Sequence, residues 1–215
     1  MIGKISQKQI LLLGLDFDDT LADSWASVTS SLAWVASHDS PESTQRLKES
    51  LHLIKGKTLE VQLNSFISNL NFENAFELYM GFYRREGLQK TTLNTGSREL
   101  LHYCKYNDIE VVVISAKTEK NLALSMSHLG LADIPIYGGC DNSKKSYLMK
   151  TLNLDLYVGD QESDVAAARY ADVKVVYLSS EETINTLSVE PDYRITNISQ
   201  TIEILRILQE AKKGS

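Results

Sequence analysis

The chain has 215 residues, of which 43% are hydrophobic and 23% are charged, and its formal net charge at pH 7 is -6. This length allows one substantial core, or one core with a smaller subdomain, and the ordinary composition excludes wholesale disorder. The acidic charge argues against sequence-independent binding of nucleic acid, which requires a basic surface. It does not exclude a small anionic ligand, because local lysines or a metal ion can hold one in an acidic protein.

The two cysteines and the first apolar run indicate where in the cell the protein is expected. Cys104 lies at an apolar position of an expected helix and Cys140 is the other cysteine, so a disulfide framework is not expected. The apolar run at 10–15 is too short for a signal sequence or a membrane span. We therefore expect a cytoplasmic protein with no membrane or nucleic-acid partner, present as a monomer or weak dimer.

Short apolar runs rich in β-branched residues alternate with helical patterns along most of the chain. The strand-like runs lie at 10–16, 109–115, 134–137, 154–159 and 173–178. The helical patterns cover 97–106, 118–129, 144–152 and 163–171, and a short run at 193–196 and an amphipathic helix follow them. This alternation predicts an α/β fold, with a Rossmann-like parallel sheet covered by helices on both faces.

Residues 22–92 interrupt the alternation, because their apolar spacing is helical throughout. Four apolar stripes begin at Trp25, Leu47, Leu59 and Phe72, and the third continues to residue 70. Ser40 followed by Pro41 favours a start of the second helix there, since the first helical turn does not use the N–H that proline lacks. The sequence therefore predicts a core of 1–21 and 93–215, with a four-helix insertion at 22–92.

Acidic residues follow two of the predicted strands. The first strand runs into Asp16-Phe17-Asp18-Asp19-Thr20, a segment that an Asp-rich turn or a helix cap would explain if it stood alone. Asp160 and Asp164 follow another buried run. Ligands of open α/β sheets bind at the carboxyl ends of the strands, so we expect these carboxylates to share one crevice.

Carboxylates that share a crevice require a cation. Like charges about 5 Å apart repel by about 3 kcal/mol per pair at an effective dielectric constant near 20. Hard carboxylate oxygens without a nearby histidine or cysteine favour Mg²⁺. We therefore expect Mg²⁺ as the cofactor, with Asp16, Asp18, Asp160 and Asp164 as the candidate metal residues.

A serine and two lysines extend the pattern. Ser115 ends the second predicted strand, where it could point into the crevice or cap the following helix. Lys144 and Lys145 stand at a helix start. The helix macrodipole disfavours lysines there, which makes a bound anion more plausible than a pair of solvated charges.

Together these residues resemble the haloacid dehalogenase-like superfamily of phosphohydrolases, and the resemblance covers nearly the whole chain. Its four signatures match the segment from Asp16 to Leu21, Ser115, a lysine at 144 or 145, and Gly159-Asp160 with Asp164. The helical insertion is similar to the mobile cap of phosphoglycolate phosphatases and β-phosphoglucomutases.

Three features depart from the family pattern. Ala116 follows Ser115 where asparagine or glycine is frequent. Asp19 stands where many relatives have glycine. The third signature lacks the Lys-Pro dipeptide of many relatives, which leaves the choice between Lys144 and Lys145 open. We favour Lys144, because Leu148 repeats a Lys-to-Leu spacing seen in relatives.

The resemblance implies a Mg²⁺-dependent phosphatase that acts through an aspartyl-phosphate. Asp16 would be the nucleophile and Asp18 the acid and base. Asp16, Asp160 and the backbone carbonyl of Asp18 would hold the metal, with support from Asp164. Ser115 and Lys144 would hold the phosphoryl oxygens, and we list Thr20, Lys57 and Lys145 as substrate-binding candidates.

Other functions remain open at this point. A phosphosugar mutase would share every reacting group of the core, and a catalytically silent binding or regulatory protein could retain the fold. The expected substrate is a small phosphorylated metabolite. The basic loop at 55–57, which contains Lys57, is either a recognition element or a solvated turn between helices.

Overall fold

The computed structural model describes residues 11–179 and 187–213. Ile10, the expected first residue of the first strand, lies outside these ranges, as do 1–9, 180–186 and 214–215. The described residues form two compact units. The core unit comprises 11–21, 93–122, 133–179 and 187–213, and the helical unit comprises 22–92 and 123–132. No helix within the described ranges is long and apolar enough to cross a membrane.

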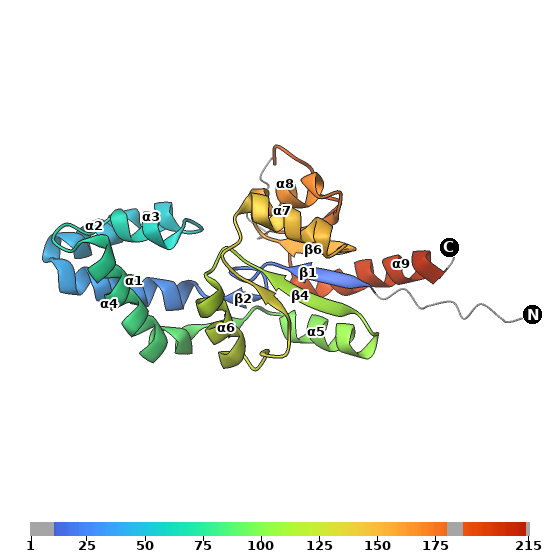
Figure 1. Ribbon diagram of the computed structural model, residues 1–215, viewed down its shortest axis with the longest axis horizontal. Coiled ribbons are helices and arrows are strands. Elements are labelled where there is room, and N and C mark those ends of the chain that lie inside the picture. The colour runs from blue at the N-terminus through green and yellow to red at the C-terminus, as the bar shows by residue number, and fades with distance from the viewer. Residues whose placement is uncertain (1–10, 180–186, 214–215) are drawn as a thin grey trace, which may run out of the picture. The chain divides into compact units, whose positions relative to one another are not determined.

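The core unit is built on a six-stranded sheet whose strands pair in the order β5-β4-β1-β6-β7-β8. Figure 1 labels the middle strands β4, β1 and β6. The pairs are parallel, and they place β1 between β4 and β6 in the middle of the sheet. The strands are β1 (Leu12–Leu15), β4 (Glu110–Ile114), β5 (Ile136–Tyr137), β6 (Leu156–Gly159), β7 (Lys174–Leu178) and β8 (Tyr193–Ile195). Each corresponds to one of the runs that the sequence predicts.

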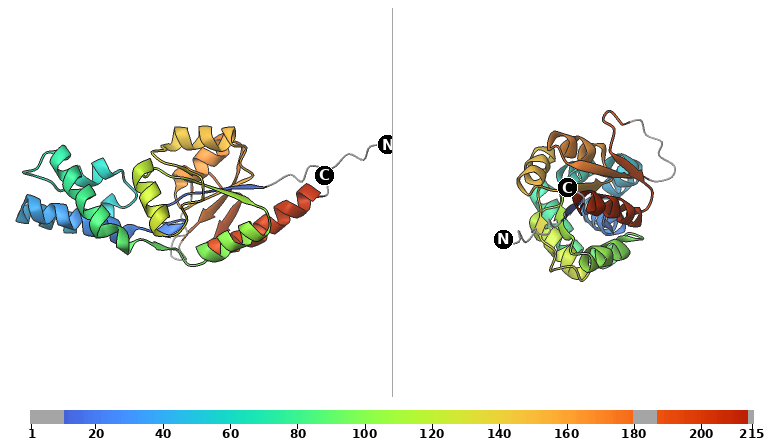
Figure 2. Two further views of the ribbon diagram at one scale, coloured as in Figure 1. Left: turned by 60° about the horizontal axis from the view of Figure 1, so that its bottom comes forward. Right: turned by 90° about the vertical axis from the view of Figure 1, so that its right-hand side faces the viewer.

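Helices cover both faces of this sheet. One face carries α7 (Asn142–Thr151) and α8 (Glu162–Tyr170), and the other carries α5 (Ser97–Tyr106) and α9 (Thr201–Lys213) (Figure 2). The short 3-10 helix η2 (Ile198–Gln200) precedes α9. This arrangement confirms the predicted α/β fold with a Rossmann-like core, in which helices cover both faces of a parallel sheet.

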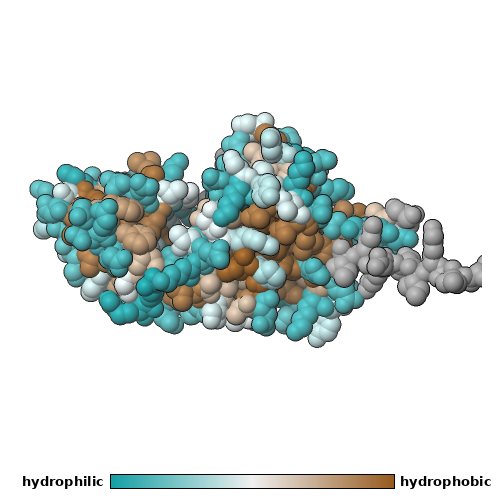
Figure 3. All heavy atoms as spheres, viewed as in Figure 1, coloured by the Kyte–Doolittle hydropathy of each residue, from teal (hydrophilic) through white to brown (hydrophobic). Residues whose placement is uncertain are grey.

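The hydrophobic core beneath α7 and α8 contains residues from strands and helices far apart in the sequence. Val112, Met149, Tyr157, Val165 and Val175 are all buried in it. Hydrophobic side chains also reach the surface of the core unit beside α7, as Figure 3 shows. Packing in this core holds α7 and α8 against one face of the sheet. The acidic segments follow β1 and β6 of the same sheet.

The helical unit contains the four predicted helices, α1 (Trp25–Asp39), α2 (Pro41–Ile54), α3 (Leu59–Asn64) and α4 (Phe72–Arg85), followed by the 3-10 helix η1 (Gly87–Lys90). The predicted start of α2 is confirmed, because Ser40 is its N-cap and accepts the N–H of Ser43 at 3.0 Å. The helices bury an apolar core of their own that includes Leu32, Leu47 and Tyr83.

Residues 123–132 also group with the helical unit, although the sequence prediction placed them in the core. They include the later turns of α6 (Glu119–His128). The buried hydroxyls of Ser125 and Tyr83 lie 2.8 Å apart and form a hydrogen bond within the unit. Two short strands, β2 (Ala22–Asp23) and β3 (Thr92–Leu93), pair with each other and were not predicted, because two residues are too few to show a strand pattern.

The third helix is shorter than its apolar stripe predicts, since α3 ends at Asn64. The chain that follows is held by the carboxylate of Asp39, at the end of α1. That carboxylate accepts the backbone N–H of Ser68 at 2.8 Å and of Asn69 at 2.9 Å, and it also accepts the N–H of Leu70 and the hydroxyl of Ser43. A tertiary contact from another helix thus replaces the last helical turns.

Asp39 should stabilise the helical unit in a pH-dependent way. Partial burial raises the pKa of Asp39, but the hydrogen bonds from Ser43, Leu70, Ser68 and Asn69 together hold it well below its ordinary value. We expect Asp39→Ala to lower the free energy of unfolding by about 2 kcal/mol at neutral pH, because five donors lose a charged acceptor, the fifth being the hydroxyl of Ser68. Urea denaturation followed by circular dichroism measures this loss.

A lowered pKa in the folded state means that the stabilisation is complete above the unfolded pKa, near 4, and is lost as pH falls below it. The difference between wild type and Asp39→Ala should therefore shrink in acid. Asp39→Asn serves as the control, since it keeps one acceptor oxygen but cannot ionise. Equal stabilities of wild type and Asp39→Ala at neutral pH would contradict this role of Asp39.

Candidate active site

Asp16 lies at the carboxyl end of the central strand. It follows β1 directly, and its backbone N–H donates to the carbonyl of Val158 in β6 at 2.9 Å. This bond continues the parallel pairing of β1 with β6 one residue beyond the strand. Asp16 is only 6% exposed. Its carboxylate is therefore fixed at the sheet edge and largely removed from water.

Two further carboxylates come from the turn that follows β6. Asp164 is fully buried in the first turn of α8, where its Oδ2 accepts the backbone N–H of Gln161 at 3.2 Å. Asp160 accepts the Thr20 hydroxyl at 3.0 Å and the Gln161 side-chain amide at 2.7 Å. Carboxylate oxygens of Asp16, Asp160 and Asp164 lie within 4.8 Å of one another. The predicted convergence of both acidic segments is thus present in the structure.

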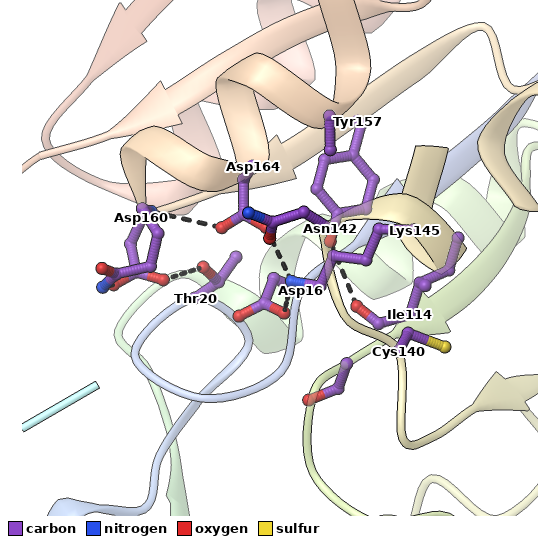
Figure 4. Close-up of polar contacts among 12 residues, drawn as sticks. Asp16, Thr20, Ile114, Cys140, Asn142, Lys145, Tyr157, Asp160 and Asp164 are labelled. Atoms are coloured by element: carbon purple, nitrogen blue, oxygen red, sulfur yellow. Dashed lines mark hydrogen bonds and ion pairs between the residues drawn. The ribbon is translucent and has the colours of Figure 1, made fainter. Parts of the chain in front are cut away.

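Lys145 lies between two of these carboxylates (Figure 4). Its Nζ is 2.7 Å from Oδ1 of Asp16 and 2.6 Å from Oδ1 of Asp164, and its side chain is 7% exposed. The Nζ also lies 5.9 Å from the centre of the buried Tyr157 ring, whose hydroxyl donates to the carbonyl of Ile114 at 3.1 Å. The lysine is therefore packed against an aromatic ring that is itself anchored to β4.

The charges of this cluster are not balanced by Lys145 alone. Three ionised carboxylates and one ammonium leave two formal negative charges. Burial raises the pKa of Asp16 above its ordinary value; Lys145 lowers it in turn, and the charges of Asp164 and Asp160 raise it further. Burial and the charge of Asp164 raise the pKa of Asp160 to about 6. The cluster is thus stabilised by taking up either protons or a further cation.

The donor set fits a hard divalent cation. Carboxylate oxygens from Asp16, Asp160 and Asp164 are gathered within one small volume, and Mg²⁺ prefers oxygen ligands of this kind. Gly159 makes the approach possible, because a Cβ at this position would lie 2.5 Å from Oδ2 of Asp164. A side chain at position 159 would collide with Asp164, so glycine is needed there for Asp164 to approach the end of β6.

Lys144 occupies a different place from its neighbour. Its Nζ donates to the backbone carbonyls of Gly138 and Gly139, at 3.2 and 3.4 Å, and not to any residue of the carboxylate cluster. The sequence analysis favoured Lys144 over Lys145 for the site, and the structure does not support that preference. Consecutive residues of a helix point about 100° apart, so only one of the two lysines can face the sheet.

The burial pattern of α7 explains why Lys145, and not Lys144, faces the sheet. Met149, four residues after Lys145, is fully buried, whereas Leu148, four residues after Lys144, is only partly buried. Residues at i and i+4 share one face of a helix. The more deeply buried stripe of α7 therefore begins at Lys145, but the sequence alone does not show which of the two stripes faces the core.

The carboxylate of Asp18 forms a second ion pair beside the cluster. It is 38% exposed, and its Oδ1 lies 2.9 Å from Nζ of Lys117, whose side chain is 10% exposed. Asp19 follows with a φ of 60°, in the left-handed region that glycine favours and that aspartate tolerates.

Lys117 was missed by the sequence analysis. It lies two residues after Ser115, a position that gave no reason to expect a contact with Asp18, 99 residues earlier in the chain. Only the parallel pairing of β4 with β1 brings the segments that follow these two strands to the same edge of the sheet. The ion pair is therefore visible only in the folded chain.

Ser115 and Thr20 are both buried in the core unit. The Ser115 hydroxyl accepts the backbone N–H of Lys117 at 3.2 Å. The Thr20 hydroxyl donates a hydrogen bond to the carboxylate of Asp160. Thr20 thus supports a carboxylate of the cluster. Lys57, in contrast, is an exposed residue of the helical unit in the turn between α2 and α3, and its role toward a substrate stays a prediction.

Comparison with known proteins identifies the family. A family model described as haloacid dehalogenase-like hydrolase matches residues 15–178. This range spans most of the chain and includes the residues of the candidate site from Asp16 to Asp164. The chain therefore belongs to the haloacid dehalogenase-like hydrolases, as its sequence signatures predict. No curated protein matches the chain.

Solved structures share the fold at low sequence identity. A haloacid dehalogenase-like hydrolase from Streptococcus pneumoniae is 18% identical, with a TM-score of 0.72 over 91% of this chain and 98% of its own. A predicted phosphoglycolate phosphatase from Haemophilus somnus is 19% identical, with a TM-score of 0.60 and coverages of 91% and 98%. A protein provisionally assigned as a β-phosphoglucomutase from Thermotoga maritima is 15% identical, with a TM-score of 0.70 and coverages of 93% and 100%.

The two neighbouring lysines provide a matched pair for testing the charge balance of the cluster. Lys145→Met should lower the free energy of unfolding by about 3 kcal/mol at neutral pH, because it leaves buried carboxylates without their counter-charge. Lys144→Met, one residue away and outside the cluster, should cost less than about 1 kcal/mol. Urea denaturation of both variants measures the difference, and equal losses would contradict the special place of Lys145.

The loss in Lys145→Met should also depend on pH. Asp160 has a pKa of about 6 in the folded protein, above its unfolded value near 4, so its ionisation costs stability as pH rises through this window. Lys145 lowers the pKa of Asp16, so its removal makes ionisation of the cluster still more costly. We therefore expect a smaller loss at pH 5 than at pH 8, and a loss that does not change with pH would contradict the electrostatic explanation.

Proposed function

We propose that this chain is a Mg²⁺-dependent phosphatase that hydrolyses a small phosphate monoester through an aspartyl-phosphate on Asp16. One observation carries the proposal: a buried carboxylate at the end of β1, bound by Lys145, lies within 4.8 Å of the oxygens of Asp160 and Asp164. A hydrolase of this family needs a nucleophile that is held rigidly in a strongly charged site. Asp16 meets that requirement.

In the first step, Asp16 is the nucleophile. A carboxylate oxygen of Asp16 forms a bond to phosphorus while the bond from phosphorus to the leaving oxygen breaks. Asp18 enters this step protonated and gives its proton to that leaving oxygen, so that an alcohol departs and not an alkoxide. The contact with Lys145 restricts the side chain of Asp16 before it attacks, which reduces the entropy lost on reaching the transition state.

In the second step, water replaces the enzyme as the acceptor. Asp18, now ionised, takes a proton from the water, whose oxygen forms a bond to phosphorus. The bond from phosphorus to Asp16 breaks, inorganic phosphate leaves, and the carboxylate is restored. Asp18 thus acts as acid in the first step and as base in the second.

Asp16, Asp160 and the backbone carbonyl of Asp18 would hold Mg²⁺, with Asp164 as a further ligand or as support. The ion, when bound, would neutralise charge on the phosphoryl oxygens. Ser115 and Lys145 would donate hydrogen bonds to those oxygens, so that Lys145 takes the role for which the sequence analysis favoured Lys144. Thr20 would hold Asp160 in place through its hydroxyl.

The expected substrate is a small phosphorylated metabolite. Two of the proteins with this fold carry names that refer to small phosphate esters, a phosphoglycolate and a phosphoglucose. Lys57 stays a candidate for substrate recognition by the helical unit. Mg²⁺ as the metal, a cytoplasmic location, and a monomeric or weakly dimeric state are parts of the same proposal.

The direct test uses p-nitrophenyl phosphate with Mg²⁺ and after chelation of the metal. Wild type should release inorganic phosphate only with the metal, and Asp16→Asn should lose activity by more than about a thousandfold, because the amide is nearly isosteric but is not an anionic nucleophile. Circular dichroism checks that the variant keeps its fold.

The possible outcomes separate the candidate activities. Activity of Asp16→Asn within about tenfold of wild type would remove Asp16 as the nucleophile. A phosphosugar mutase would return the phosphoryl group to the sugar without stoichiometric release of phosphate. A silent binding protein would show no metal-dependent turnover on any ester of a metabolite panel.

A further inference from the structure

The orientation of the Asp18 carboxylate matters for the proposed reaction. In the proposed reaction Asp18 must present one oxygen to the leaving group, yet its side chain is 38% exposed and lies in the turn after β1. An exposed aspartate can rotate about its side-chain bonds between several staggered positions. Something must restrain the carboxylate if it is to transfer a proton efficiently.

Lys117 provides a contact of the required kind. Its Nζ donates to Oδ1 of Asp18 at 2.9 Å, and its side chain is only 10% exposed, so most of its stem is enclosed by the protein. The same Nζ lies 5.6 Å from the centre of the Phe17 ring, which is itself fully buried. The ammonium group thus lies between an aromatic face and the carboxylate.

The backbone of Lys117 is anchored on both sides. Its N–H donates to the Ser115 hydroxyl at 3.2 Å, and its carbonyl accepts the N–H of Gly139 at 2.8 Å. These bonds tie the turn after β4 to the segment after β5. Lys117 therefore extends from an anchored backbone toward Asp18, and its enclosed side chain limits the positions that Nζ can take.

We propose that Lys117 is a positioning residue for the reaction: by binding Oδ1 of Asp18 it directs the other oxygen, Oδ2, toward the leaving group. The inference rests on the proposed phosphatase function. Lys117 acts on the orientation of Asp18 and takes no part in bond making or breaking. The proton passes from Oδ2 to the leaving oxygen as the bond to phosphorus breaks.

Two aryl esters of nearly the same shape test this role. p-Nitrophenolate departs readily without a proton, whereas phenolate is a poorer leaving group that depends more on the acid. The ratio kcat/KM covers only the steps up to departure of the alcohol, so hydrolysis of the phosphoenzyme, which is common to both esters, does not enter. The selectivity between p-nitrophenyl phosphate and phenyl phosphate therefore reports on proton transfer from Asp18.

We expect Lys117→Met to lower kcat/KM for phenyl phosphate by about 10- to 100-fold, within the range that general acid catalysis contributes. The loss for p-nitrophenyl phosphate should be less than about threefold. Lys120→Met, which removes an exposed lysine three residues along the chain, is the matched control and should leave both values near wild type. A merely structural role of Lys117 would lower both values equally.

A double-mutant cycle shows whether Lys117 acts through Asp18. In the Asp18→Asn background, Lys117→Met should not change the selectivity between the two esters any further. Lys117→Arg keeps the charge and should recover part of the phenyl phosphate activity. If Lys117→Met does not fold, as judged by circular dichroism, Lys117→Gln is used in the same comparison.

Equal losses on both esters, no loss on either, or the same change of selectivity in the Asp18→Asn background would each overturn the positioning role while leaving the phosphatase proposal intact. Failure of the proposed function has a different signature. In that case wild type would hydrolyse neither ester with Mg²⁺, or Asp16→Asn would retain activity, and the role of Lys117 would fall with it.

Discussion

The structure depends on the concentration of negative charge at the carboxyl ends of β1 and β6. Asp16, Asp160 and Asp164 are held within 4.8 Å of one another by the parallel pairing of two neighbouring strands, and Lys145 compensates only part of their charge. Buried carboxylates repel strongly unless a cation joins them. A site of this kind is costly for folding, so its presence at the ligand-binding edge of the sheet points to a function that uses it.

Several local features serve to keep this charge in place. The missing side chain of Gly159 admits Asp164, the Thr20 hydroxyl holds Asp160, and Tyr157 supports Lys145. The second ion pair, between Asp18 and Lys117, is attached to the ends of β1 and β4. The two lysines come from the turn after β4 and from α7, so the site forms only when these segments are brought beside β1 and β6.

The sequence predicted the elements of this fold well because their signals are local. Five apolar runs and the short run at 193–196 located the strands of the main sheet, and Ser40-Pro41 located the start of α2. The missed features depend on contacts between distant residues. The early end of α3 follows from the Asp39 carboxylate, the partner of Asp18 comes from 99 residues away, and the choice of Lys145 over Lys144 depends on which face of α7 packs on the sheet.

Calorimetric titration with Mg²⁺ tests most directly whether the three carboxylates form a metal site. Wild type should bind one Mg²⁺, and Asp160→Asn should bind it at least about tenfold more weakly, because one anionic ligand is lost. Asp133→Asn, which removes an exposed carboxylate elsewhere in the core unit, is the control and should bind as wild type does. No binding to wild type, or equal affinities of wild type and Asp160→Asn, would contradict the metal site on which the proposed function rests.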